Sequence, residues 1–207
     1  MTLSRGGYLV VAVVLALFAI VTALVLASPG SGDPSRLLLR LLGLYGYLSL
    51  SLAAILTLYL RDIYKLFGRP FLKVHHTFAA FGLAAITLHP VVLAVRIASP
   101  RIFVPDITSW DGFWINAGRP ALIVIYIALA AALIRTRIPT FWKHLHLLMV
   151  AALTFAIVHA NLIGTDFQYA SIALLYNGLF AVVIGAIVVK HTTARAQRPA
   201  EPAKKSR

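Results

Sequence analysis

The chain has 207 residues, of which 60% are hydrophobic and only 12% are charged, and this is more apolar surface than one soluble core of that size can bury. The composition therefore favours a membrane protein over a soluble one. The formal net charge of +13 is spread along the chain and forms no single basic face, so nucleic-acid binding is not predicted.

Six apolar stretches follow one another and predict an all-α integral membrane protein, a six-transmembrane-helix bundle. Five of them approach the roughly 20 residues that a bilayer requires, whereas the fourth is shorter. The first could instead be a cleaved signal peptide, but its apolar run exceeds the ~7–15 residues of a signal core, so a retained helix is predicted. The stretches are Tyr8–Ala27, Leu41–Leu60, Val74–Val95, Pro120–Ile134, Leu145–Ile163 and Ala170–Val189.

The segments between and after these stretches carry little that could form another domain. Residues 96–119 contain aromatic side chains that predict a segment lying on the membrane surface, with substrate docking as the alternative; among them are Trp110, Phe113 and Trp114. Residues 1–190 are predicted to form one membrane domain. Residues 191–207 are basic and rich in proline and alanine, which predicts a disordered cytoplasmic tail.

The basic residues predict the orientation of the chain. If the N-terminus is cytoplasmic, fourteen of the 19 Lys and Arg residues fall in inner segments. Lys and Arg accumulate in short cytoplasmic segments, so both termini are predicted to be cytoplasmic in a multi-pass protein of the cell membrane. Anionic membrane lipid is the expected partner of these basic segments.

Several kinds of redox centre are excluded as features of the chain itself. There is no cysteine, so thiolate-ligated clusters, disulfides and covalently attached c-type haem are not expected. No Gly-rich dinucleotide or Walker motif is present, and no soluble segment is long enough for a flavin or nicotinamide domain. Any flavoprotein reductase is therefore expected to be a separate molecule.

Histidines concentrate in two of the predicted helices. The third stretch and its mouth hold His75, His76 and His89, and the fifth holds His144, His146 and His159. Ionisable residues inside a membrane are costly and usually functional. Both helices run outward from a lysine at the cytoplasmic boundary, Lys73 or Lys143. The six histidines therefore fall into an inner and an outer level, each with members from both helices.

Two levels of facing imidazoles predict two haems, because bis-imidazole ligation needs one neutral ring on each side of the iron. His75 and His89 lie 14 residues apart, which returns within about 40° of the same helix face and rises about 21 Å. On the fifth helix His144 is about 60° and His146 about 140° out of phase with His159. Helical phase alone therefore favours His144.

The histidine-bearing segments resemble the ferric reductase-like transmembrane domain, over about residues 69–164. This family includes ferric reductases, NADPH oxidases and the stand-alone haem subunit of a bacterial methionine sulfoxide reductase system. The third helix resembles the family's His-Arg-x-Leu-Gly…His pattern through His75, His76, Phe78, Ala79 and His89. Because His76 and Ala79 depart from that pattern, His76 stays an alternative to His75 as the inner ligand.

The fifth helix carries the closer match. It resembles the family's Trp-x-x-Leu-His…His pattern through Trp142, Leu145, His146 and His159. The resemblance implies a six-helix bundle in which two b-type haems are ligated between the third and fifth helices. It also implies a 13-residue step on the fifth helix, and so favours His146 over His144.

The predicted function is transmembrane electron transfer through haem iron held by His75, His89, His146 and His159. The resemblance implies a donor on the cytoplasmic side, either a separate flavoprotein or a quinol, and an external acceptor or partner reductase. The chain would be an oxidoreductase-type electron-transfer subunit with no catalytic residue of its own. The alternatives are a histidine-lined proton or metal-ion transporter and a non-redox structural subunit. The sequence leaves open the donor, the acceptor, one or two haems, and the oligomeric state.

Overall fold

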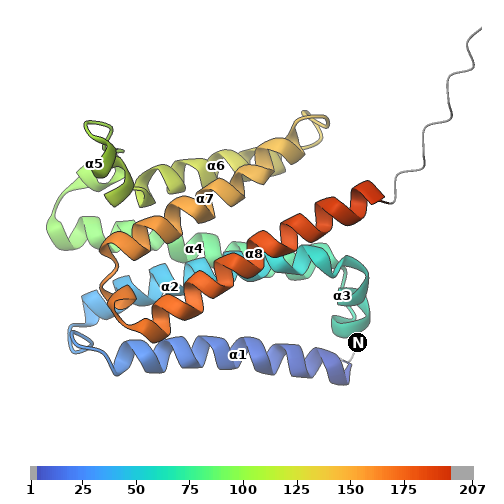
Figure 1. Cartoon of the computed structure of the whole chain (residues 1–207), viewed down its shortest axis with the longest axis horizontal. Coiled ribbons are helices and arrows are strands. Elements are labelled where there is room, and N and C mark those ends of the chain that lie inside the picture. The colour runs from blue at the N-terminus through green and yellow to red at the C-terminus, as the bar shows by residue number, and fades with distance from the viewer. Residues whose placement is uncertain (1–3, 197–207) are drawn as a thin grey trace, which may run out of the picture.

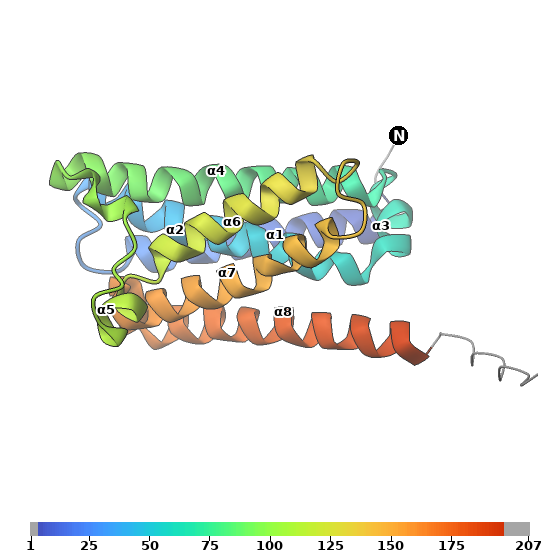
Figure 2. The same cartoon turned by 90° about the horizontal axis from the view of Figure 1, so that it is seen from above.

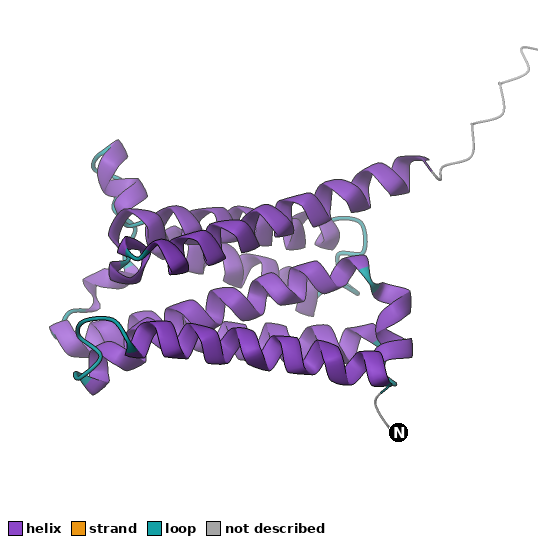
Figure 3. Ribbon diagram, turned by 60° about the horizontal axis from the view of Figure 1, so that its bottom comes forward, coloured by secondary structure: helices purple, strands orange, loops and turns teal. Residues whose placement is uncertain are grey.

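The computed structural model describes residues 4–196, and over that range it contains helices and connecting turns but no strand (Figure 3). The α-helices are α1 (Arg5–Leu26), α2 (Pro34–Ile55), α3 (Leu60–Phe67), α4 (Phe71–Ile97), α5 (Trp110–Ile115), α6 (Gly118–Leu133), α7 (Trp142–Ile163) and α8 (Ala170–Ala196). Three short 3-10 helices join them: η1 (Leu56–Leu58), η2 (Pro100–Phe103) and η3 (Thr165–Gln168).

The long helices α1, α2, α4, α6, α7 and α8 lie roughly along one direction and alternate in sense (Figures 1 and 2). The beginning of α1, the end of α8, the short helix α3 and the α6–α7 turn lie at one end of the bundle, which we call the α3 end. The α1–α2 turn, α5 and η3 lie at the opposite end, which we call the α5 end. Both histidine-bearing helices, α4 and α7, therefore run from the α3 end to the α5 end.

The described residues form an all-helical structure consistent with an α-helical membrane protein, as the composition predicts. Five helical segments are long and apolar enough to cross a bilayer: α1, α2 with η1, α4, α7 and α8. The remaining long helix, α6, has 16 residues. Large apolar side chains point outward, with Leu9 66% and Leu174 78% exposed, which is the pattern expected where lipid replaces water around the bundle.

The helix boundaries differ from the predicted ones where polar residues begin or continue a helix. α2 begins at Pro34, earlier than predicted, because the Asp33 side chain accepts hydrogen bonds from the first free backbone N–H groups. A hydrogen bond from the Ser35 hydroxyl, followed by the bond from the Arg36 backbone N–H, lowers the pKa of Asp33 to about 2. The segment 96–119 contains η2 and α5, and α8 continues to Ala196 into the predicted tail. Residues 197–207 of that tail lie outside the described residues.

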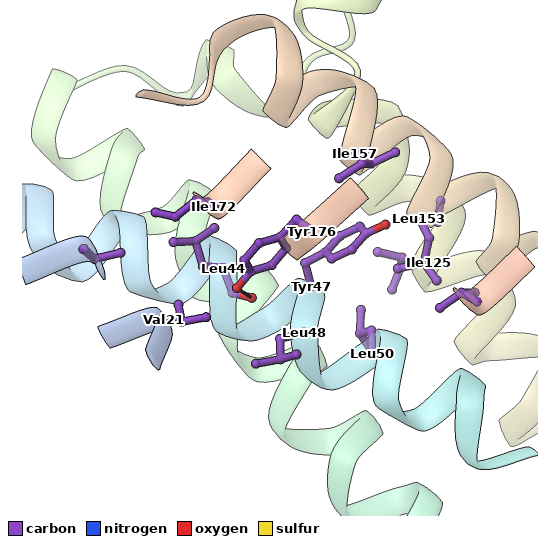
Figure 4. Close-up of a cluster of buried hydrophobic side chains, with 13 residues drawn as sticks. Val21, Leu44, Tyr47, Leu48, Leu50, Ile125, Leu153, Ile157, Ile172 and Tyr176 are labelled. Atoms are coloured by element: carbon purple, nitrogen blue, oxygen red, sulfur yellow. Dashed lines mark hydrogen bonds between the residues drawn. The ribbon is translucent and has the colours of Figure 1, made fainter. Parts of the chain in front are cut away.

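The main core lies where α1, α2, α6, α7 and α8 converge (Figure 4). Val21, Leu48 and Ile172 are almost completely buried there, and Tyr176 of α8 packs beside Tyr47 of α2. The Tyr176 hydroxyl also donates a hydrogen bond of 3.0 Å to a backbone carbonyl of α2. This core holds α8 and α1 against α2.

Glycines allow α2 and α4 to cross at very short range. A Cβ atom added at Gly46 would lie 2.3 Å from Cγ2 of Ile86, and one added at Gly82 would lie 2.8 Å from Cγ of Leu50. Small residues at such crossings let helix backbones approach closely, which replaces the missing hydrophobic driving force in lipid. α2 with α4, and α6 with α7, are the two most extensive helix contacts in the described chain.

Two buried hydroxyls of α2, those of Tyr47 and Ser51, have no hydrogen-bond partner among the described residues. Tyr47 is 7% exposed and its hydroxyl is unpaired. Because the Tyr47→Phe change removes a polar group that is buried without compensation, we expect unfolding of the detergent-solubilised protein at an unchanged or higher temperature.

The matched control is Tyr176→Phe, which removes the hydroxyl that donates to the Leu44 carbonyl. Loss of that bond is expected to cost about 0.5–1.5 kcal/mol. Thermal unfolding of the two variants, measured in the same detergent, separates them. A Tyr47→Phe protein that melts below Tyr176→Phe would contradict the assignment of an unpaired hydroxyl.

Candidate cofactor-binding site

The candidate site lies between two helix pairs. α4 packs closely on α2, and α7 packs closely on α6, but α4 and α7 make hardly any close backbone contact with each other within residues 4–196. The histidines of α4 and α7 therefore belong to two different helix pairs, α2 with α4 and α6 with α7. Such an arrangement lets side chains of α4 and α7 approach each other without requiring the two helix backbones to touch.

The first facing pair is His75 of α4 and His146 of α7, which we call the α3-end pair. Their ring centroids lie 6.4 Å apart with an interplanar angle of 68°. Aromatic side chains flank both rings: Phe71 lies 5.4 Å from His75, and Trp142 lies 6.3 Å from His146, centroid to centroid. Both histidines are partly buried.

The second pair is His89 of α4 and His159 of α7, which we call the α5-end pair. Both are partly buried. A glycine faces each ring. A Cβ atom added at Gly43 of α2 would lie 3.0 Å from Nδ1 of His89, and one added at Gly118 of α6 would lie 3.0 Å from Cδ2 of His159. The two glycines therefore provide the space in which these rings sit.

All four rings share one hydrogen-bond pattern: Nδ1 lies against a backbone carbonyl of the supporting segment. A carbonyl oxygen can only accept, so Nδ1 carries the proton and donates it, and the Nε2 lone pair of each neutral ring is left for another partner. The Nδ1-to-oxygen distances are 3.1 Å from His75 to Ala53, 2.8 Å from His89 to Leu39, 3.3 Å from His146 to Ala128 and 2.7 Å from His159 to Ile115.

The two alternative ligands are placed differently. His76 and His144 are both exposed, and neither ring makes a hydrogen bond within the described part of the chain. His144 instead lines a shallow apolar groove of about 330 Å³ on the surface of α7 and α8. The structure thus brings the His75 ring close to the His146 ring and holds His89 and His159 against carbonyls of the supporting segments. Both alternatives stay exposed, although the His76 ring lies 5.9 Å from the His75 ring, centroid to centroid.

The geometry does not follow the helical-phase argument that favoured His144. That argument assumed that both ligands of α7 point along one face of an ideal helix. In the structure His146 reaches toward the middle of α6, whereas His159 reaches toward the end of α5. Because the two rings approach different carbonyls, they need not share one helical phase.

The donor set fits a group that needs only two protein ligands per metal. Within residues 4–196 no cluster of three or more His, Asp or Glu side chains could hold a metal ion by itself. A haem iron already has four ring nitrogens and takes its axial ligands from the protein. With metal–imidazole bonds of about 2 Å, two opposed imidazoles have ring centres roughly 6 Å apart. The 6.4 Å separation in the α3-end pair agrees with that value.

Several residues of the site were not predicted from the sequence. Gly43 and Gly118 carry no chemistry of their own, and the four carbonyl acceptors are backbone atoms that any residue would provide. A signal was present for Gly43, because it interrupts the predicted stretch Leu41–Leu60, in which glycine is unfavourable, whereas Gly118 lies just before the fourth predicted stretch. It did not indicate which histidine each glycine would face.

No protein-family model matches this chain, and no curated protein or solved structure was found to be similar to it. The function must therefore be argued from the arrangement of the four histidines.

Proposed function

We propose that this protein carries electrons across a membrane through two b-type haems, one ligated by the α3-end pair and one by the α5-end pair. In this proposal all six long helices span the cell membrane, with α6 completed by the segment just before it. The α3 end, with both termini, is cytoplasmic. The excess of Lys and Arg in the segments at that end supports this orientation.

The observation that carries the proposal is the shared hydrogen-bond pattern of the four rings. A metal-ligating histidine almost always donates its other ring N–H to a carbonyl, a carboxylate or water, which fixes the tautomer and the ring orientation. All four intramembrane histidines show this pattern, two on each helix, and in each of them Nδ1 is the nitrogen that donates. A histidine that only joined helices could donate from either nitrogen.

The residues of the chain would orient the ligands of the redox group and shape the space around it. The carbonyls of α2 and of the α5–α6 segment would hold the four imidazoles neutral, with the proton on Nδ1 and the Nε2 lone pair available as a ligand. Gly43 and Gly118 would keep the space around the α5-end rings open. When bound, each haem iron supplies a one-electron redox centre. The 14-residue step from His75 to His89 spaces the two levels by about 21 Å along α4.

The proposed direction is from the cytoplasmic side outward. A separate flavoprotein or a quinol would deliver electrons at the α3 end, and an external acceptor or partner reductase would receive them at the α5 end. The aromatic residues at the α3-end pair, Phe71 and Trp142, support a donor that approaches there with a planar ring system, because such rings stack on aromatic side chains.

The test is the absorption spectrum of the purified full-length protein, oxidised and then reduced with dithionite, together with the haem-to-protein ratio. Reduced b-type bands at about two haems per chain are expected. A colourless protein from cells with ample haem would reject the conduit. Proton or metal-ion flux into vesicles by that colourless protein would then support a transporter, and an absence of flux would leave a structural subunit.

A further inference from the structure

A buried ion pair at the α5 end is not used by the proposed haem ligation. It joins Arg40 of α2 to Asp166 of η3, whose side chains are 6% and 7% exposed. Nε of Arg40 donates to both carboxylate oxygens at 3.0 Å, and Nη2 donates to the same carboxylate. This is the only buried ion pair among the described residues; the other two are at least one-third exposed.

The same guanidinium gathers three segments of the chain. Nη2 of Arg40 also donates to the hydroxyl of Ser28, and Nη1 donates to the carbonyl of Pro29 at 3.3 Å. Ser28 is itself buried, at 6% exposed. The α1–α2 turn, the first turns of α2 and the α7–α8 connection are therefore tied together at a single side chain.

The position of this cluster relates it to the α5-end pair. Arg40 directly follows Leu39, whose carbonyl accepts the Nδ1 proton of His89. Asp166 lies just beyond the end of α7, the helix that carries His159. The ion pair thus connects the support of one ring to the helix of the other. No buried ion pair plays this part for the α3-end pair within residues 4–196.

Stability alone is a poor explanation for such a pair. Removing two charges from water costs more than their attraction commonly returns, and apolar side chains of similar volume often hold a core equally well. What a multiply bonded guanidinium adds is direction, because its planar fork accepts a carboxylate in only a few orientations. The Arg40–Asp166 ion pair is therefore suited to fixing the relative position and orientation of two helices.

We propose that Arg40 and Asp166 are positioning residues that set the separation of α4 and α7 at the α5-end pair. Through that separation they set the geometry in which His89 and His159 meet a shared ligand. The α3-end pair, which lacks this connection, keeps its geometry without them. The inference rests on the proposed haem ligation for its redox readout, but not for its distance readout.

The distance readout uses spin labels, which cysteine substitution can place cleanly because the chain has no cysteine. Labels at Val95 and Leu162 report the α5 ends of α4 and α7, and labels at Leu72 and Leu147 report the α3 ends; all four side chains are exposed. In the Asp166→Asn protein we expect the Val95–Leu162 distance distribution to broaden and shift. The Leu72–Leu147 distribution should stay as in the unsubstituted protein.

The matched control is Asp62→Asn, which changes the charge equally and breaks an exposed ion pair, to Lys65. It should leave both distributions unchanged. If Asp166→Asn does not fold, the double change Arg40→Met and Asp166→Leu removes the connection without leaving one charge buried. An unchanged Val95–Leu162 distribution in a folded variant would overturn the proposal.

The redox readout is a potentiometric titration of the haem bands in the same variants. We expect the midpoint potential of the α5-end haem to shift and that of the α3-end haem to stay constant. Equal shifts of the midpoint potentials of both haems would show that the Arg40–Asp166 ion pair has only a general structural role. That result would also overturn the proposal. A colourless parent protein whose Val95–Leu162 distance still responds to Asp166→Asn would reject the proposed haem function while supporting the positioning role.

Discussion

Replacing either histidine of the α5-end pair by alanine is expected to lower the haem content from about two per chain to about one. His89→Ala and His159→Ala should each remove the same haem, because each leaves one side of the iron without its imidazole. His75→Ala and His146→Ala should each remove the other haem. The measurement is the haem-to-protein ratio with the reduced spectrum of each purified variant.

The chain provides two matched controls for this prediction. His76 and His144 lie beside the α3-end ligands in sequence but are exposed. His76→Ala and His144→Ala should therefore retain both haems. Loss of a haem in His144→Ala, with retention in His146→Ala, would show that helical phase and not the observed geometry identifies the ligand on α7.

A single methyl group added at the α2–α4 crossing is expected to destabilise the bundle strongly. In Gly46→Ala the new Cβ would lie 2.3 Å from Cγ2 of Ile86 and 3.0 Å from its backbone nitrogen. Because backbone as well as side chain must move, a cost of at least about 1–3 kcal/mol is expected. α2 also supplies the carbonyls for His75 and His89, so haem binding should weaken at both levels. Thermal unfolding and haem content of the purified variant test both effects.

The control for this substitution is Gly178→Ala on α8, where no atom lies within 4 Å of the added Cβ. Alanine is a better helix former than glycine by roughly 1 kcal/mol, so Gly178→Ala should be neutral or slightly stabilising. Equal melting temperatures for Gly46→Ala and Gly178→Ala would contradict the close crossing of α2 and α4.

Much of the architecture follows from local sequence pattern. Long apolar stretches predict helices because a backbone in lipid must satisfy its own hydrogen bonds, and each predicted stretch corresponds to one of the long helices. The short helices α3 and α5 were not predicted. Each has eight residues or fewer, too few for a period of 3.6 residues to be distinguished from irregular sequence.

The choice among neighbouring histidines depended on contacts between helices. The sequence by itself determined that two helices carry histidines at two matched depths, because depth follows from the rise per residue along a helix. It could not determine that His146 and not His144 faces His75. That depends on where the carbonyl of Ala128 lies, and so on how α6 packs against α7.

Local sequence pattern predicts the class of protein, but it does not predict which distant residues come into contact. An apolar, basic, cysteine-free chain with two histidine-bearing helices follows from composition and periodicity, because both are local properties. Tertiary packing was needed to show that Gly43 and Gly118 make room for rings. It also decided that Arg40 is buried against Asp166, 126 positions away. Contacts between residues so distant in sequence arise from the packing of whole helices, which no local pattern encodes.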